Sequence, residues 1–516
     1  MKKKILISIS IVAITLISFL IFGLIKNNIY ASPKGQLSYK EKKQDAEYLL
    51  TFLEENYPYF DLKKRTTGYD FLNHKQELIN KISKAKNDKE FYVNVYETMK
   101  LLQNSHSIVA ESSHINLYKN SSDQYGKFNG IIDVEATSQA EYWDKIYLDL
   151  FRFPDIKCQY IDGNYVVSSS LNSNIQIGNI ISEVNNIPVE EYLKSNMDKY
   201  TLKYDFSRKT FYTDTLFLEF GVDENRLLNV SIINGDIKNA QVHFSKYDKD
   251  KLSKLTKGNS SIILEVITSK IIEEDNIAYL KVNSMSDNKI HMDEVDIFFK
   301  SVTGYKNLII DIRGNGGGSD LMINTIIKNL NSKDDTVDNY YCYRNSNFMN
   351  ELIKDLPYST LTEIPTTLKN IPLNGFKTVK YLRTLPFDKN AFAGNVYILT
   401  DKVVYSSSEQ FSNIIKQYNL GKLIGETTGG DGIGSAPVIN TLPNSKMCIL
   451  IPSSMGIDLE GNINEEVHTS PDYYVEQNIN DYLKALELNI TDIECSKYDT
   501  VFNKCIDIIK NNTLPK

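Results

Sequence analysis

The chain contains few cysteines, and this scarcity limits what kind of protein it is. Its 516 residues include five cysteines, which are scattered along the sequence. So few and so widely spaced thiols exclude a disulfide-dense scaffold and a zinc knuckle, and we expect neither a metal nor a cofactor. Only Cys495 and Cys505 stand close enough to suggest a pair, and two unrelated small apolar residues explain them equally well.

Three further features are missing, and each removes a class of function. The net charge of −7 gives no excess of basic residues, which argues against nucleic acid as a partner. The glycine run from Gly314 to Gly318 lacks the spacing and the lysine of a P-loop, and its contiguous glycines do not form a dinucleotide fingerprint. No Gly-x-Ser-x-Gly elbow is present, so an esterase of the α/β-hydrolase type is a weak interpretation.

Residues 1–31 differ from the rest of the chain. Three lysines, Lys2 to Lys4, precede an uncharged apolar stretch from Ile5 to Ile25, and about 20 such residues span a bilayer. The positive flank keeps the N-terminus in the cytoplasm. Because a secretory signal has an apolar region of only ~7–15 residues, we expect a single-pass membrane anchor with the bulk of the chain outside the cytoplasm, or a secreted protein if Ile29-Tyr30-Ala31 is cleaved. No cysteine lies in or just after this segment to accept a lipid.

The hydrophobic periodicity changes along the remaining sequence and predicts several domains. Residues 36–125 have the apolar spacing of helices, and residues 150–245 alternate as short strands do. Residues 260–480 alternate strands with helices, which predicts an α/β core with its sites at strand ends, and residues 481–516 form a C-terminal tail. Within the core, the weak signals between Asn331 and Gly394 indicate a lid or an extra subdomain.

Two junctions in the α/β core are typical of functional sites. Ser406 follows an apolar strand and precedes a helical pattern, so its hydroxyl is expected at the rim of a sheet beside a helix N-terminus. The strand from Leu308 to Ile312 runs into the glycine turn at Gly314 to Gly318, whose amides are free to face an oxyanion or a peptide backbone. Far upstream, His106 stands at the end of a predicted helix.

A further run, from Ile177 to Val189, resembles the carboxylate-binding repeat of PDZ domains, in which a glycine-polar pair precedes an apolar strand and a turn. Asn179 stands where an aspartate is usual, and Asn186 where a glycine is usual. The resemblance implies a PDZ-like module that captures peptides by strand addition. A β module that only packs between its neighbours is an equal alternative.

Taken in order, the motifs of the chain resemble those of the tail-specific, or C-terminal-processing, serine peptidases. The resemblance covers roughly residues 40 to 480 and implies a crotonase-like α/β peptidase core, preceded by a helical domain and a PDZ-like module. It rests on Glu54-Glu55-Asn56-Tyr57-Pro58, Ser105-His106, the PDZ-like run, Asp311-Ile312-Arg313-Gly314-Asn315-Gly316-Gly317-Gly318, Tyr405-Ser406-Ser407-Ser408-Glu409, Gly425-Glu426-Thr427-Thr428-Gly429-Gly430 and Ser470-Pro471-Asp472.

Within that family the nucleophile is the serine three residues before a glutamate, which here is Ser406. One branch of the family activates this serine with a lysine, but Asp431 stands in the equivalent segment, and a carboxylate cannot act as a neutral amine base. The tricorn-like branch instead uses a Ser-His pair, matched by Ser105 and His106, and a glutamate shortly before the Pro-Asp pair. Glu465 and Glu466 are both candidates for that glutamate, and the spacing favours Glu465.

These roles are chemically consistent with peptide-bond hydrolysis. His106 would take the proton of Ser406 and pass it to the leaving amine, while Ser105, held by Glu465, would orient the imidazole ring. The backbone N–H groups of Gly317 and Ser407 would stabilise the oxyanion, with Gly318 as the neighbouring alternative to Gly317; one such donor is worth ~3–4 kcal/mol.

The sequence therefore predicts a serine endopeptidase that acts on unfolded or tail-exposed proteins. The competing interpretation is a non-catalytic peptide-binding scaffold that keeps the fold; Asp431 and the altered PDZ turn are its support. Among the other histidines, His468 lies close to Glu465 in sequence and is the strongest rival to His106 as the base.

Overall fold

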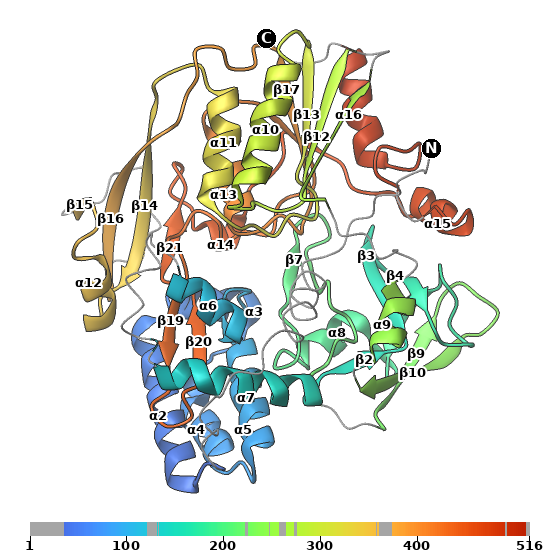
Figure 1. Ribbon diagram of the computed structural model, residues 1–516. Helices are drawn as coiled ribbons and strands as arrows, with labels where there is room; N and C mark the ends of the chain where they lie inside the picture. The colour runs from blue at the N-terminus through green and yellow to red at the C-terminus, as the bar shows by residue number, and fades with distance from the viewer. Residues whose placement is uncertain are drawn as a thin grey trace.

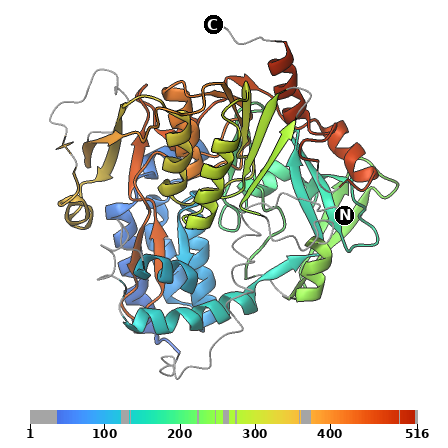
Figure 2. The same ribbon diagram turned by 45° about the horizontal axis from the view of Figure 1, so that its top comes forward.

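The computed structural model describes residues 36–120, 132, 134–221, 225–246, 248–256, 265–272, 276–357, 359–360, 374–490 and 493–511. The predicted anchor, residues 1–31, lies outside this part of the chain. Among the residues that are described, no helix is long and apolar enough to cross a membrane. Figures 1 and 2 show a helical region, a β module and a sheet covered by helices, which pack side by side.

The N-terminal region is helical, as its periodicity predicts. Ser38 and Glu41 form a reciprocal capping box at the start of the first helix, which satisfies backbone donors that a helix terminus leaves unpaired. The face with Ala46, Leu49 and Leu53 is buried in the core that this region shares with later strands. The helices are α2 (Tyr39–Asn56), α3 (Phe60–Thr67), α4 (Lys75–Ser83), α5 (Asp88–Lys100), α6 (Ser112–Asn120) and α7 (Val134–Leu150).

A short strand joins this helical region to the C-terminal half of the chain. Strand β1 (Ile108–Ala110) pairs antiparallel with β20 (Cys448–Ile451), and β20 also pairs with β19 (Val438–Thr441). Apolar residues of the helices and of these strands form one continuous buried cluster. Because β1 begins two residues after His106, the pairing ties the segment that carries this histidine to strands that follow Asp431 in the sequence.

Residues 152–246 form the β module. A 7-stranded sheet has the order β2-β10-β9-β5-β4-β3, with β6 on β5, and β7 and β8 form a separate hairpin. Whether this module corresponds to a PDZ domain stays a prediction. Its elements are β2 (Arg152–Pro154), β3 (Ile156–Ile161), β4 (Asn164–Ser170), β5 (Ile180–Val184), β6 (Ile187–Pro188), α8 (Val189–Lys194), β7 (Lys203–Asp205), β8 (Thr210–Tyr212), β9 (Leu227–Ile232) and β10 (Asn239–Lys246); α9 (Lys249–Thr256) follows.

The α/β core is a 6-stranded sheet with helices on both faces (Figure 1). Its strands run parallel from β12 to β22, and β11 is antiparallel to β12 at one edge. One face packs on α10, α11 and α13, and the other on α16. In order, the strands are β11 (Ile267–Ile272), β12 (Ile277–Val282), β13 (Asn307–Asp311), β17 (Asn395–Thr400), β18 (Lys422–Gly425) and β22 (Tyr473–Tyr474); the helices are α10 (Lys289–Ser301), α11 (Asp320–Leu330), α13 (Ser407–Gln417) and α16 (Thr500–Lys510).

The described residues between 331 and 394, where sequence signals are weak, include most of a second sheet. This sheet is 4-stranded, has the order β15-β16-β14-β21 and lies beside the core. It comprises β14 (Thr336–Arg344), β15 (Ser359–Thr360), β16 (Phe376–Thr384) and β21 (Ser454–Ile457), with α12 (Asn347–Ile353) alongside.

The C-terminal residues pack onto the core and the β module. Apolar side chains of α16, among them Cys505, bury one face of the central sheet, and α15 (Ile479–Glu487) lies against β3. Cys495 does not pair with Cys505, because all five cysteines are free thiols. The buried carboxylate of Asp499 receives hydrogen bonds from both terminal nitrogens of Arg313, at 2.7 and 2.8 Å. This ion pair fixes α16 to the end of β13.

Replacing Asp499 with alanine should lower the free energy of unfolding by on the order of 3 kcal/mol, because it leaves the buried Arg313 guanidinium with one carboxylate partner fewer. Urea unfolding followed by circular dichroism measures the change. Asp293→Ala removes an exposed ion pair with Lys289 on α10 and should cost less than ~1 kcal/mol. Equal effects of the two substitutions would show that the ion pair does not hold α16.

Candidate active site

Ser406 lies between β17 and α13 in a strained backbone conformation. Its φ and ψ angles are +57° and −128°, a region that side-chain-bearing residues rarely occupy and that is found at functional sites. Gly317 packs directly against it, since a Cβ atom at Gly317 would lie 2.7 Å from Cβ of Ser406. The glycine motif therefore leaves room for the serine, which aims its side chain into a cavity.

His106 stands next to this serine. Its Nε2 lies 3.1 Å from Oγ of Ser406, across 300 positions of sequence. Its other ring nitrogen, Nδ1, lies 2.9 Å from Oδ2 of Asp431. A carboxylate can only accept, so Nδ1 carries a proton, which leaves Nε2 as the acceptor for the serine hydroxyl. The three side chains form the arrangement of a Ser-His-Asp triad.

The sequence analysis gave Asp431 no catalytic role; it named this residue only as the one that stands in place of a lysine. It lies in a buried loop with a φ of +46°. Its Oδ1 accepts a hydrogen bond from the hydroxyl of Tyr59 at 2.5 Å, and its Oδ2 accepts one from Tyr405 at 3.3 Å. Burial alone would raise the pKa of Asp431, but the hydrogen bond and electrostatic attraction of His106, together with hydrogen bonds from Tyr59 and Asn104, outweigh it and hold the pKa below its usual value. Asp431 is therefore an anion that can orient and stabilise the imidazole.

Asn104 is a second residue that the sequence analysis missed. Its side-chain oxygen accepts from the backbone N–H of His106 at 2.8 Å. Its amide nitrogen donates to Asp431 at 2.8 Å and to Glu465 at 3.1 Å. One side chain thus holds both the histidine backbone and the carboxylate that faces its ring. An asparagine two residues before a histidine is too common a pattern to have singled it out.

The predicted link from Glu465 through Ser105 to His106 needs correction. Ser105 is exposed, and the described residues show no hydrogen bond from it to His106 or Glu465. Glu465 instead forms an ion pair with Lys63 at 2.5 Å, and Glu466 pairs with Arg65. The physical reason is that Asp431 already occupies the position beside Nδ1 of the histidine ring.

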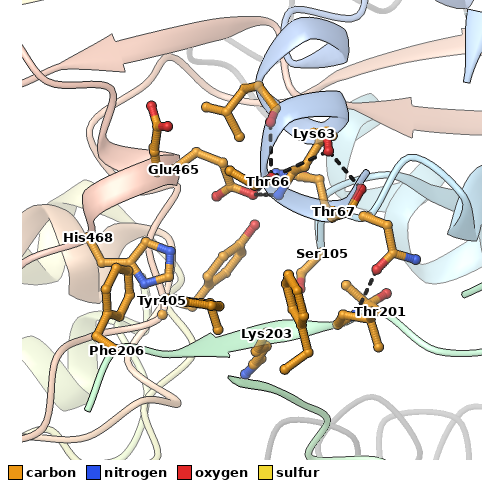
Figure 3. A pocket seen from close by; sticks show the side chains of 18 residues that line it. Lys63, Thr66, Thr67, Ser105, Thr201, Lys203, Phe206, Tyr405, Glu465 and His468 are labelled. Atoms are coloured by element: carbon orange, nitrogen blue, oxygen red, sulfur yellow. Dashed lines mark hydrogen bonds and ion pairs between the residues drawn. The ribbon is translucent and has the colours of Figure 1, made fainter. Parts of the chain in front are cut away.

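Ser105, Glu465 and His468 lie on the wall of a second cavity, of about 310 Å³ (Figure 3). His468 is half-buried and donates from Nδ1 to the carbonyl oxygen of Thr428, 2.7 Å away, while its ring meets Phe206 edge-on. Burial lowers the pKa of His468 to about 4. This histidine is therefore a packed neutral side chain, and the ring that contacts Ser406 is that of His106.

The expected oxyanion donors are only partly available. The N–H of Gly317 is occupied, because it donates to the side-chain oxygen of Asn315 at 2.9 Å. Ser407 begins α13, where backbone N–H groups have no partner within the helix. Gly318 and Ser407 line the same cavity as Ser406, whose volume is about 300 Å³. Gly318, the alternative to Gly317, and Ser407 are therefore the candidate pair of donors.

Part of the chain matches a known protein family. Residues 276–475 match the model of peptidase family S41. The protein is a serine-type peptidase, which is a hydrolase.

The solved structures that resemble this protein include CPAF. A mutant of CPAF matches with a TM-score of 0.59 at 14% identity, covering 93% of this chain and 99% of that one. Mature CPAF complexed with lactacystin gives 0.56 at 13% identity, covering 92% and 99%. The photosystem II D1 C-terminal processing protease gives 0.40 at 12% identity, covering 89% and 99%. The fold is thus shared with CPAF over most of both chains, and no curated protein matches the sequence.

The buried carboxyl of Glu465 gives the site a measurable pH dependence. Burial is the largest cause that raises its pKa from 4.5 to about 7, and the charge of Asp431 adds to it, against the lowering effect of Lys63. Between about pH 4.5 and 7 the folded protein therefore keeps a proton that the unfolded chain has lost, so this group makes stability fall as the pH rises.

Glu465→Gln removes this titration. We expect the melting temperature of the parent protein, relative to that of the Glu465→Gln variant, to fall between pH 5 and pH 8. Differential scanning fluorimetry of both proteins in matched buffers measures the difference. A difference that does not change with pH would mean that Glu465 ionises normally.

Proposed function

We propose that the protein is a serine endopeptidase in which Ser406 attacks the peptide bond, His106 moves the proton and Asp431 orients His106. The observation that carries this proposal is the continuous chain of hydrogen-bond distances, 3.1 Å from Ser406 to His106 and 2.9 Å from His106 to Asp431. These distances meet the geometric requirement for an activated serine nucleophile.

In the first step Oγ of Ser406 would form a bond to the carbonyl carbon as its proton moves to Nε2 of His106. The imidazolium then formed faces the anionic Asp431, and its proton passes to the leaving amine as the peptide C–N bond breaks. A water molecule, deprotonated by the same nitrogen, hydrolyses the acyl-enzyme and releases the serine. The N–H groups of Gly318 and Ser407 would stabilise the oxyanion in both steps.

The proposed location is the outer side of the cell membrane, with residues 1–31 as a single-pass anchor and a secreted form if the anchor is cleaved. The lysine-flanked apolar segment supports this location. The proposed substrates are unfolded or tail-exposed proteins, as implied by the resemblance to tail-specific peptidases. Peptide capture by a PDZ-like module at residues 150–245 is part of the same proposal.

The alternative of a non-catalytic scaffold has lost its main support. The sequence offered Asp431 as a sign of lost chemistry because it replaces a lysine. Its contact with His106 supports a role for the aspartate in orienting the histidine, since a serine that is activated by histidine does not need the lysine.

The direct test is cleavage of a reduced, unfolded protein in the presence of EDTA, with fragments followed by mass spectrometry. The parent should produce fragments, and the Ser406→Ala and His106→Ala variants should be slower by a factor of at least ~1000. Circular dichroism of each variant checks that it is folded. Absence of cleavage by a folded parent would favour a scaffold, and full activity of the His106 variant would exclude His106 as the base.

A second pair of variants separates the triad from the predicted tetrad. Asp431→Asn should lower kcat about 10⁴-fold, as an amide in this position favours the wrong histidine tautomer. Ser105→Ala should change kcat less than about threefold, because Ser105 is exposed and does not hydrogen-bond His106. A large loss of kcat in Ser105→Ala with a small one in Asp431→Asn would instead support the predicted role of Ser105. Kinetics on a peptide substrate measures both values.

A further inference from the structure

A buried arginine lies in the wall of the cavity that holds Ser406. Arg383 reaches this cavity from β16 and is 9% exposed. Its Nη2 donates to the side-chain oxygen of Asn324 at 2.6 Å. The side-chain amide of Gln410 satisfies both of its neighbours in one orientation. In that orientation the amide nitrogen donates to Asp320 at 2.9 Å, and the amide oxygen accepts from Nη1 of Arg383 at 3.1 Å. The guanidinium is thus held by two neutral amides, one from α11 and one from α13.

The positive charge of Arg383 is only weakly balanced by protein carboxylates. Among the described residues, Asp320 is the carboxylate that pairs with Arg383. Its Oδ2 lies 3.8 Å from Nη1 of Arg383, and its side chain is 54% exposed. That distance exceeds a hydrogen bond. Buried charges in proteins are normally paired, so a cation held by neutral amides in a cleft wall is suited to bind an anion. A guanidinium binds a carboxylate with two parallel hydrogen bonds.

The arginine group adjoins the proposed oxyanion donors. Asp320 follows Gly318 by two residues, and Gln410 lies one helical turn after Ser407, on the same face of α13. All of them line one cavity with Ser406. A substrate whose carbonyl oxygen lies between Gly318 and Ser407 would therefore place a neighbouring side chain toward Arg383.

We propose that Arg383 forms a substrate subsite for a carboxylate, which makes the enzyme prefer an acidic side chain close to the bond that is cut. The inference rests on the proposed function, because it assigns a substrate class to that same cleft. The carboxylate can come from an Asp or Glu side chain or from the C-terminus of a substrate. We assign the carboxylate to an Asp or Glu side chain, because the guanidinium lies in the cavity wall where an internal stretch of peptide would pass Ser406.

The test begins with a peptide mixture digested by the parent protein and analysed by mass spectrometry. Acidic residues should be enriched at one position within about two residues of the cleaved bonds. Matched peptides then carry Glu, Gln or Leu at that position, each with a free or an amidated C-terminus. We expect kcat/KM to be about 10–100 times higher for Glu than for Gln, as charge-assisted hydrogen bonds predict, and amidation should not change this ratio.

Substitutions test whether Arg383 causes the preference for Glu over Gln. Arg383→Gln should bring the Glu/Gln ratio close to one while the Leu peptide is still cut. Lys380→Gln removes the same charge from the same strand, where Lys380 pairs with Asp338 outside the cavity, and should leave the ratio unchanged. Asp320→Asn, which removes the competing exposed carboxylate, should raise the ratio and tests the proposal even if the arginine variant does not fold.

The outcomes separate this inference from the proposed function. Cleavage without acidic enrichment, or an unchanged ratio in Arg383→Gln, would overturn the carboxylate subsite and leave the peptidase intact. A ratio abolished by C-terminal amidation would assign the carboxylate to the chain end instead. If the parent cuts none of the peptides, fluorescence anisotropy of labelled Glu and Gln peptides with the Ser406→Ala variant measures the preference as binding; equal affinities would overturn it.

Discussion

The pairing of β1 with β20 is the interaction on which the proposed active site depends. Ser406 and Asp431 lie in the C-terminal half of the chain, but His106 follows the helices of the N-terminal region, and three residue pairs between Ile108–Ala110 and Cys448–Leu450 hold the two parts together. The buried cluster shared by the helices and by β19 and β20 supports the same junction. Because hydrogen-bond distances at Ser406 tolerate little displacement, the site exists only while this junction is intact.

Two buried carboxylates, Asp431 and Glu465, lie close to His106, and their surroundings shift the two pKa values in opposite directions. Asp431 receives hydrogen bonds from His106, Tyr59 and Asn104, which keep it ionised. Glu465 is paired with Lys63 and is pushed toward its neutral form by burial and by the charge of Asp431. Environments that push the pKa values of neighbouring acids apart are a common feature of enzymes. Here they leave Asp431 as the anion that faces the imidazole ring.

The second sheet gives the cleft a wall that the core alone does not supply. Through β16 it brings Arg383 into contact with Asn324 of α11, which begins two residues after Gly318, and with Gln410 of α13, which begins at Ser407. Chemistry and selectivity would therefore come from different parts of the chain. In this proposal the glycine motif and Ser406 form the reaction centre, and the segment between the core strands β13 and β17 would determine which side chain fits beside it.

Much of this organisation follows from local sequence. The strand that ends at Ser406, the glycine turn, the helical region and the α/β alternation are each encoded by neighbouring residues, and the contact between Ser406 and His106 agrees with the predicted pair. Asp431 and Ser105 show the limit of this reasoning. Both residues were singled out in the sequence, but whether an aspartate or a serine faces the ring depends on how segments 325 positions apart fold together.

The same limit applies to the other residues that were missed or misassigned. Gly317 was expected to donate to the oxyanion, but the orientation of one neighbouring side chain, Asn315, occupies its N–H. Arg383 lies in a stretch without a clear pattern, and its place in the cleft comes from sheet pairing. The sequence by itself determined the residue types and the local elements. Only the tertiary structure decided which polar groups meet, because hydrogen bonds act over about 3 Å, whereas sequence patterns report on neighbours along the chain.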